Sequence, residues 1–314
     1  MRFVLICFGL LVIFALATLW RSARNEAQSE TDYPARGALV SVNGQAIHYE
    51  QFGAGPDIIL IHGASGNTRD LTLGLVTALQ DRFRVTVFDR PGLGYSSAGS
   101  DPSIIAQAGI LAEATRYIGL ENPVVLGQSY GGSVALAWAL TQADMASSLV
   151  LLGTPSLPWD TPPPLVYRIN THPIWGHLSR PLISAWVPSS YVSGEIEKIF
   201  APDAAPTGYS DYIGAGLTLR RASLYANAIQ RVNLRNEIEA LAPQWAQLTL
   251  PVQLVHGAAD TIVGAEIHSI PLAQILPNAQ LTLIEGAGHM PHHTHLEEVI
   301  TAVDRAFAAT ERDK

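Results

Sequence analysis

Cysteine is almost absent from this chain, since Cys7 is the only one among 314 residues. A single cysteine excludes an intramolecular disulfide and a cysteine-based metal site. Basic clusters are also scarce: none stands out beyond the pair Arg220 and Arg221, and the formal net charge is −8. Nucleic-acid binding therefore has no electrostatic basis here. We also find no internal repeat and no low-complexity tract.

Charged residues make up only 15% of the chain, whereas hydrophobic residues make up 48%. This balance is typical of a globular protein with a large core and not of a disordered one. The length is sufficient for one large α/β domain or for a domain that carries an insertion.

An uncharged segment of eighteen residues runs from Phe3 to Trp20. It reaches the lower length limit for a helix that crosses a bilayer. Trp20 with Arg21 and Arg24 after it is a typical membrane-interface pattern. We predict that residues 1–21 form a membrane anchor.

A cleaved signal peptide is the alternative for this segment, because Ala15–Ala17 has the small-x-small form of a cleavage site. The anchor is favoured because the apolar run continues past that site. We expect the globular part to be extracytoplasmic in the first case, and secreted or periplasmic in the second. Residues 22–37 are polar, contain Pro34 and Gly37, and are interpreted as a linker.

Apolar runs without polar alternation recur through the next part of the chain, separated by helix-type segments. This pattern predicts strands buried on both faces of a mostly parallel sheet that is flanked by helices, an α/β fold. Before these runs, Asn43 and Gly44 lie between two strand-type segments and predict a β-hairpin. The buried runs are residues 58–61, 85–88, 124–126 and 148–152.

The pattern changes between Pro155 and Trp245, where prolines are frequent and four of the six tryptophans occur. We predict that residues 155–245 form a helical cap over a core made of residues 38–154 and 246–314. The aromatic side chains of this cap either pack among themselves or line an apolar pocket.

A strand-type run ends in Gly127–Gly131, with Ser129 at its centre, and a helix-type run follows at once. Small residues two positions before and after the serine allow strand and helix to approach closely. The pattern places the Ser129 hydroxyl at the carboxyl end of the sheet, where ligands bind in such folds.

A serine hydroxyl needs a base to accept its proton, and a carboxylate to fix the tautomer of that base. His289 and Asp260 each follow the end of a predicted strand, at the edge where Ser129 lies. The chain order serine, aspartate, histidine is the order expected for a nucleophile on such a turn. We therefore predict Ser129, Asp260 and His289 as the catalytic residues.

Five short motifs follow one another along the chain in an order that resembles the α/β-hydrolase fold family, in its cap-bearing branch. The resemblance implies an oxyanion hole built from two backbone N–H groups. One belongs to Tyr130, and the other to Ala64, with Ser65 as the second choice. The motifs are His62–Gly66, Asp89–Ser96, Gly127–Gly132, His256–Asp260 and Gly288–His289.

Several other residues in these motifs have chemistry-bearing side chains with alternative roles. Relatives that open epoxides or remove halides use an aspartate nucleophile, and the serine disfavours both chemistries. Some relatives carry the acid after the strand before the cap, but Gly153 and Thr154 occupy that place here. His62 and His256 are interpreted as loop-shaping residues, and Asp89 as a structural one.

His289 has three further histidines near it in the sequence, which raises the question of a metal site. No carboxylate ligand pattern accompanies them, and His289 has a stronger role as the base. We predict neither a metal nor a cofactor. The three are His292, His293 and His295.

The sequence thus predicts a serine hydrolase that attacks an ester-like or activated acyl carbonyl through an acyl-enzyme on Ser129. The expected partners are a small apolar acyl or ester substrate and the membrane, while the oligomeric state stays open. The alternatives on the same residues are a carbon–carbon bond hydrolase, a lactonase or amidase, and a serine-type haloperoxidase. A non-catalytic small-molecule binding protein with this fold is the alternative outside the enzymes.

Overall fold

A mixed sheet of eight strands forms the centre of the computed structural model, which describes residues 1–312. The strand order is β1-β2-β4-β3-β5-β6-β7-β8. Strands β3 to β8 are parallel, whereas β2 is antiparallel to both of its neighbours, β1 and β4. The predicted mostly parallel sheet is confirmed. The strands are β1 Ala38–Val42, β2 Gln45–Phe52, β3 Asp57–Ile61, β4 Arg84–Phe88, β5 Val124–Gln128, β6 Ser148–Leu152, β7 Val252–Gly257 and β8 Ala279–Ile284.

The hairpin between β1 and β2 turns at Asn43 and Gly44, whose φ angles are 52° and 80°. Two consecutive positive φ angles define the turn type that matches the twist of paired strands, and Asn-Gly adopts it with least strain. The predicted hairpin is therefore present.

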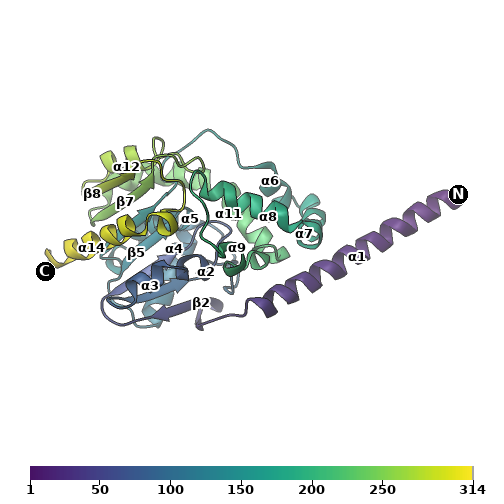
Figure 1. Cartoon of the computed structure of the whole chain (residues 1–314), viewed down its shortest axis with the longest axis horizontal. Helices are drawn as coiled ribbons and strands as arrows, with labels where there is room; N and C mark the ends of the chain where they lie inside the picture. The colour runs from purple at the N-terminus through teal and green to yellow at the C-terminus, as the bar shows by residue number, and fades with distance from the viewer. Residues whose placement is uncertain (313–314) are drawn as a thin grey trace.

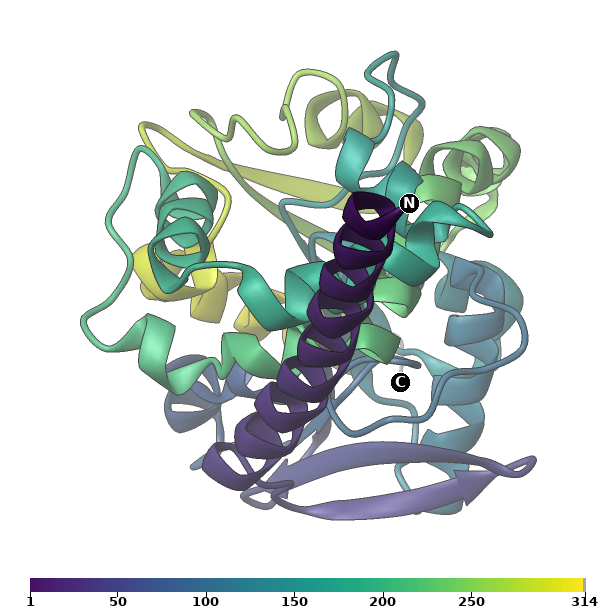
Figure 2. The ribbon, with the colours of Figure 1, turned by 90° about the vertical axis from the view of Figure 1, so that its right-hand side faces the viewer.

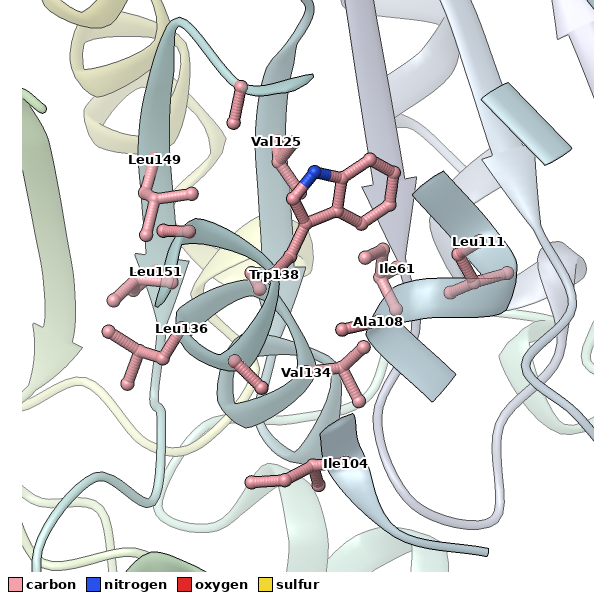
Figure 3. Packing of buried hydrophobic residues seen from close by; sticks show 14 of the residues in the cluster. Ile61, Ile104, Ala108, Leu111, Val125, Val134, Leu136, Trp138, Leu149 and Leu151 are labelled. Carbon is pink, nitrogen blue, oxygen red and sulfur yellow. The ribbon is translucent and has the colours of Figure 1, made fainter. Parts of the chain in front are cut away.

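Helices cover both faces of the sheet, as expected for buried parallel strands. On one face, Trp138 of α5 is fully buried and packs near Val125, Ile61 and Leu111 (Figure 3). An aromatic side chain of this size buries about 150–250 Å² and so contributes strongly to the stability of its cluster. The core helices are α2 Thr68–Thr72, α3 Leu75–Leu79, α4 Ile104–Tyr117, α5 Tyr130–Thr141, α12 Ser269–Ile275, α13 Pro291–Thr294 and α14 Leu296–Arg312.

The other face of the sheet is covered by α3 and α14. Val124 and Leu126 point there, one position away from Val125, because successive side chains of a strand point to opposite faces. Every residue of β5 is buried, and hydrophobic clusters pack on both faces of this strand, so β5 is held rigidly from two sides. This rigidity positions the residue that follows β5.

The chain between β6 and β7 is helical and contains no strand, in agreement with the predicted helical cap. These helices lie together beyond one edge of the core (Figure 1). They are α6 Leu165–Thr171, α7 Trp175–Trp186, α8 Ser189–Phe200, α9 Tyr209–Tyr212, α10 Ala215–Thr218, α11 Arg221–Leu241 and the 3₁₀ segment η2 Ala242–Gln247.

The first helix, α1, runs without a break from Arg2 to Asp32. Residues 22–32 are therefore helical, and the predicted linker is wrong over this part. The physical reason is contact with the cap: Asn25 donates to Ser184 O at 2.9 Å, and Glu26 pairs with Arg221 at 2.7 Å. Figure 2 shows α1 lying across the cap helices.

Candidate active site

Ser129 lies in the sharp turn between β5 and α5, with φ 51° and ψ −119°. A non-glycine residue in this region costs about 1–3 kcal/mol, and such strain clusters at functional sites. The Ser129 N–H donates to Leu152 O at 2.7 Å, which ties the turn to β6. A Cβ at Gly127 would clash with the backbone of Gly131, so glycine is required for this close approach.

His289 follows β8 and lies between the other two predicted residues. Its Nε2 is 3.0 Å from Ser129 Oγ, and its Nδ1 is 2.6 Å from Asp260 Oδ2. All three side chains are buried, with Ser129 only 4% exposed. The structure therefore brings the three predicted residues into one hydrogen-bonded chain.

Asp260 lies in the loop after β7 and is held by its own backbone turn. Its Oδ1 accepts the N–H groups of Ile262 and Val263 at 2.8 and 2.9 Å. Burial alone would raise the pKa of this carboxyl, but hydrogen bonds from His256 and His289 hold the pKa well below its usual range. Asp260 is thus a carboxylate at neutral pH, which keeps the proton of His289 on Nδ1.

His256 contributes more than the loop-shaping role that the sequence predicts. Its Nε2 is 2.8 Å from Val263 O and 3.2 Å from Asp260 Oδ2, while its Nδ1 lies 2.5 Å from Ser269 Oγ. The N–H on Nε2 thus faces both the backbone of the acid loop and the acid itself. In the sequence, the sign of this supporting role is that His256 precedes Asp260 by four residues. That spacing can be interpreted only once the geometry of the loop is known.

The backbone next to Ser129 includes the two segments that the resemblance assigns to the oxyanion hole. Tyr130 is the first residue of α5, where an N–H has no partner within the helix. Gly63 lies so close that a Cβ on it would be 3.2 Å from Ser129 Cβ, and Ala64 is the next residue. The Ser65 N–H donates to Asn227 Oδ1 of α11 at 2.9 Å. Since the N–H of Ser65 is engaged, Ala64 is the better candidate.

Arg90 is a fully buried cation that the sequence analysis missed. Its Nε donates to His62 O and its Nη2 to Gly63 O, both at 3.0 Å. Its Nη1 donates to Gln107 and to Gln230 of α11, at 2.8 and 2.7 Å. Burial lowers the pKa of this guanidinium to about 10, so the group stays charged at neutral pH. Arg90 thereby fixes the loop before Ala64 and ties that loop to the cap.

His62 and Asp89 have the structural roles that the sequence predicts. His62 Nε2 accepts the Arg90 N–H at 3.0 Å, and burial, with the nearby guanidinium, lowers the pKa of His62 to about 4. Asp89 accepts the N–H groups of Thr68 and Tyr95, both at 2.8 Å. Neither side chain is free to act as a base.

A second histidine cluster includes two residues of α13, His292 and His293. His293 Nε2 is 2.9 Å from Asp70 Oδ1, His292 Nε2 is 3.6 Å from Asp70 Oδ2, and the Tyr209 hydroxyl donates to Asp70 at 2.8 Å. The argument that no carboxylate accompanies these histidines is wrong, because Asp70 comes from α2, far away in sequence. The ligand atoms of Asp70, His292 and His293 lie within 4.8 Å of one another, so these residues have the donor types of a metal site.

Residues 56–296 match the family model described as the alpha/beta hydrolase fold. This match covers more than half of the chain, and the chain therefore belongs to the α/β-hydrolase fold family. Its relatives include esterases and a dehalogenase, which supports a hydrolase.

Two curated relatives show the range of chemistry within this family. A pimeloyl-[acyl-carrier protein] methyl ester esterase of Nitrosomonas europaea is 28% identical, over 82% of this chain and 98% of its own length. Haloalkane dehalogenase 2 of Mycobacterium bovis is 29% identical, over 88% of this chain and 96% of its own. Among solved structures, a bacterial membrane phospholipase A has a TM-score of 0.69 at 20% identity, over 99% of both chains. That likeness is one of fold, and it extends into α1.

Proposed function

We propose that the protein is a serine hydrolase that cleaves an ester-like or activated acyl carbonyl. The observation that carries this proposal is the chain of short contacts from Ser129 Oγ to His289 Nε2 and from His289 Nδ1 to Asp260. This is the arrangement of nucleophile, base and orienting acid that makes a serine hydroxyl reactive.

In the first step, His289 Nε2 accepts the proton of Ser129 as Oγ attacks the carbonyl carbon. The oxyanion forms beside the N–H groups of Tyr130 and Ala64, and each such donor supplies about 3 kcal/mol of transition-state stabilisation. His289 then gives its proton to the leaving alcohol, and an acyl-enzyme remains. Water, deprotonated by His289, releases the acid and restores Ser129.

An ester is the preferred substrate for two reasons. Ser129 stands at the position where halide-removing relatives carry an aspartate, so the dehalogenase relative is a weaker guide to chemistry than to fold. The methyl ester esterase relative has a carbonyl substrate by its name. The aromatic side chains of the cap favour an apolar acyl or alcohol group of small to medium size.

Fluorophosphonate labelling tests the nucleophile directly. The wild type should be labelled and Ser129→Ala should not. Equal labelling of both proteins, or of neither, would refute the assignment. Rates on p-nitrophenyl esters of increasing chain length, with the same variant as control, would then define the acyl pocket.

The N-terminal helix completes the proposal as a membrane anchor. It is long and apolar enough to cross a bilayer, and only 6% of its apolar 18-residue segment is buried. We place the globular part outside the cytoplasm. The protein should stay in the membrane fraction after a carbonate wash, whereas release of a form that lacks residues 1–17 would show a cleaved signal.

A further inference from the structure

An exposed apolar stripe runs along α7 of the cap. Its four members recur at spacings of three or four residues, so they share one face of the helix. They are large side chains, from 40% to 58% exposed, and a stripe of this kind marks an interaction surface more often than chance exposure. The stripe consists of Trp175, Leu178, Leu182 and Trp186.

The stripe of α7 is continuous with the apolar surface of α1. The Trp186 ring stacks on Phe14, with 6.0 Å between ring centroids, and its Nε1 donates to Thr18 Oγ1 at 3.0 Å. Both partners belong to the uncharged segment of α1. The end of α7 therefore lies beside the second half of that segment. It also contacts the first polar residues after the segment, since Arg21 Nε and Asn25 Nδ2 donate to Ala185 O and Ser184 O.

The length of α1 sets how deep this contact lies. Residues 3–13, which precede Phe14, span about 16 Å of helix at 1.5 Å per residue. The hydrocarbon core of a bilayer is about 30 Å thick, so it must also include the stretch from Phe14 to Trp20. Figure 1 shows the N-terminal end of α1 projecting away from the body, and the cap beside its other half.

Cations and aromatic rings mark the level on α1 where the membrane–water interface would lie. The Arg21 guanidinium lies 4.5 Å from the Trp186 ring centre, and that of Arg24 lies 5.6 Å from the Trp20 ring centre. Tryptophan and arginine pairs of this kind are typical of the membrane–water interface. Beyond them, Glu26 and Glu30 pair with Arg221 and Arg220 of the cap, as polar surface outside the membrane would.

We propose that the α7 stripe lies in the lipid leaflet beside α1, so that the cap itself is partly inserted in the bilayer. The partner is the acyl-chain region of a lipid membrane. This inference rests on the proposed anchor and not on the hydrolase chemistry. An ester dissolved in the membrane would then reach the cap directly from the bilayer.

A lipid-depth probe on the full chain tests this proposal. In a Cys7→Ser background, Leu178→Cys is labelled with an environment-sensitive fluorophore and reconstituted in phosphatidylcholine vesicles with or without nitroxide-labelled acyl chains. Tyr117→Cys is the matched control, because Tyr117 lies on α4 and is 62% exposed. We expect a blue shift and loss of most of the emission at position 178, and neither at position 117.

Equal behaviour at both positions, while the protein resists a carbonate wash, would overturn the inserted cap and leave the anchor intact. A blue shift at position 178 without quenching by the nitroxide lipids would also overturn it, because a second copy of the chain would then cover the stripe. Release of the protein by the carbonate wash would overturn anchor and insertion together. Fluorophosphonate labelling of Ser129 in the same samples keeps the hydrolase proposal separate from each outcome.

Discussion

Two buried clusters in this protein have the same composition: one aspartate between two histidines. Asp260 lies between His256 and His289, and Asp70 lies between His292 and His293. The clusters even share one loop, because α13 begins two residues after His289. What differs is the group that completes each of them.

In the first cluster, the free nitrogen of His289 faces a serine hydroxyl at 3.0 Å, at the carboxyl edge of the sheet. In the second, the additional group is the Tyr209 hydroxyl, which donates to the carboxylate and leaves no nucleophile beside an imidazole. Tyr209 belongs to the cap and Asp70 to the core, so this cluster joins the two parts. The comparison teaches that an Asp–His pair indicates chemistry only when its outer nitrogen reaches a reactive group.

The largest expected effect is that of Ser129→Ala. Loss of the nucleophile should reduce kcat by about 10⁴- to 10⁶-fold, as in other serine triads. The melting temperature should stay the same or rise, because the replaced hydroxyl serves only the chemistry. Ester hydrolysis with a calorimetric melt measures both, and a variant with wild-type kcat would remove Ser129 from the proposal.

Asp260→Asn should come next, with a loss of about 10⁴-fold in kcat and little change in KM. The amide would stabilise the wrong tautomer of His289 and leave its imidazolium without a countercharge. The same rate assay measures it. A loss seen mainly in KM would mean that Asp260 positions substrate and not His289.

Asp70→Asn should produce the opposite pattern. It leaves His292, His293 and Tyr209 facing a neutral group, and breaking a buried pair costs about 3–5 kcal/mol. We expect a clear drop in the denaturant midpoint, with kcat within about threefold of wild type near neutral pH. An equal drop on adding a chelator to the wild type would contradict a cluster held by protein groups alone and show a bound metal ion instead.

The smallest effect concerns acid stability through His292. Burial, with His293 nearby, lowers the pKa of His292 to about 4, and His289 and Asp70 are the other groups that face it. Between pH 6.5 and 4 the unfolded chain binds a proton that the folded chain does not. This group therefore makes stability fall by about 1.4 kcal/mol per pH unit as pH decreases through that window.

The variant His292→Gln should have a shallower pH dependence of unfolding free energy between pH 6.5 and 4, whatever its stability at neutral pH. Urea unfolding at half-unit pH intervals measures the slope. Identical slopes in variant and wild type would show that His292 takes up its proton in the folded protein.

The local patterns of the core were readable in the sequence because each is short. Buried runs, the Asn43–Gly44 turn and the serine turn are all set by neighbours within a few residues. The link from Asp70 to His293 was not readable, because it joins residues 223 positions apart. The linker prediction for residues 22–32 was wrong for a similar reason. The polar residues of this segment have ordinary helix propensity, and their contact with the cap decides that they are helical.

The loop that carries Ala64 could be predicted from the sequence, but the side chains that hold it, Arg90 and Asn227, could not. Nothing near Ala64 in sequence reveals that a cap helix holds the loop, because Asn227 and Gln230 lie more than 160 residues further along. Two polar side chains in a helical segment are ordinary surface residues until the fold brings them to a buried loop.

The link between α11 and the Ser65 N–H has a consequence for protein engineering. An exchange of the helices between β6 and β7 for those of a relative would remove Asn227 and Gln230, and with them two supports of the loop that carries Ala64. The cap helices of this chain thus affect both the substrate range and the turnover rate. A chimera that changes its preferred ester should also lose rate on every ester, unless the donor helices bring equivalent amide side chains to the same places.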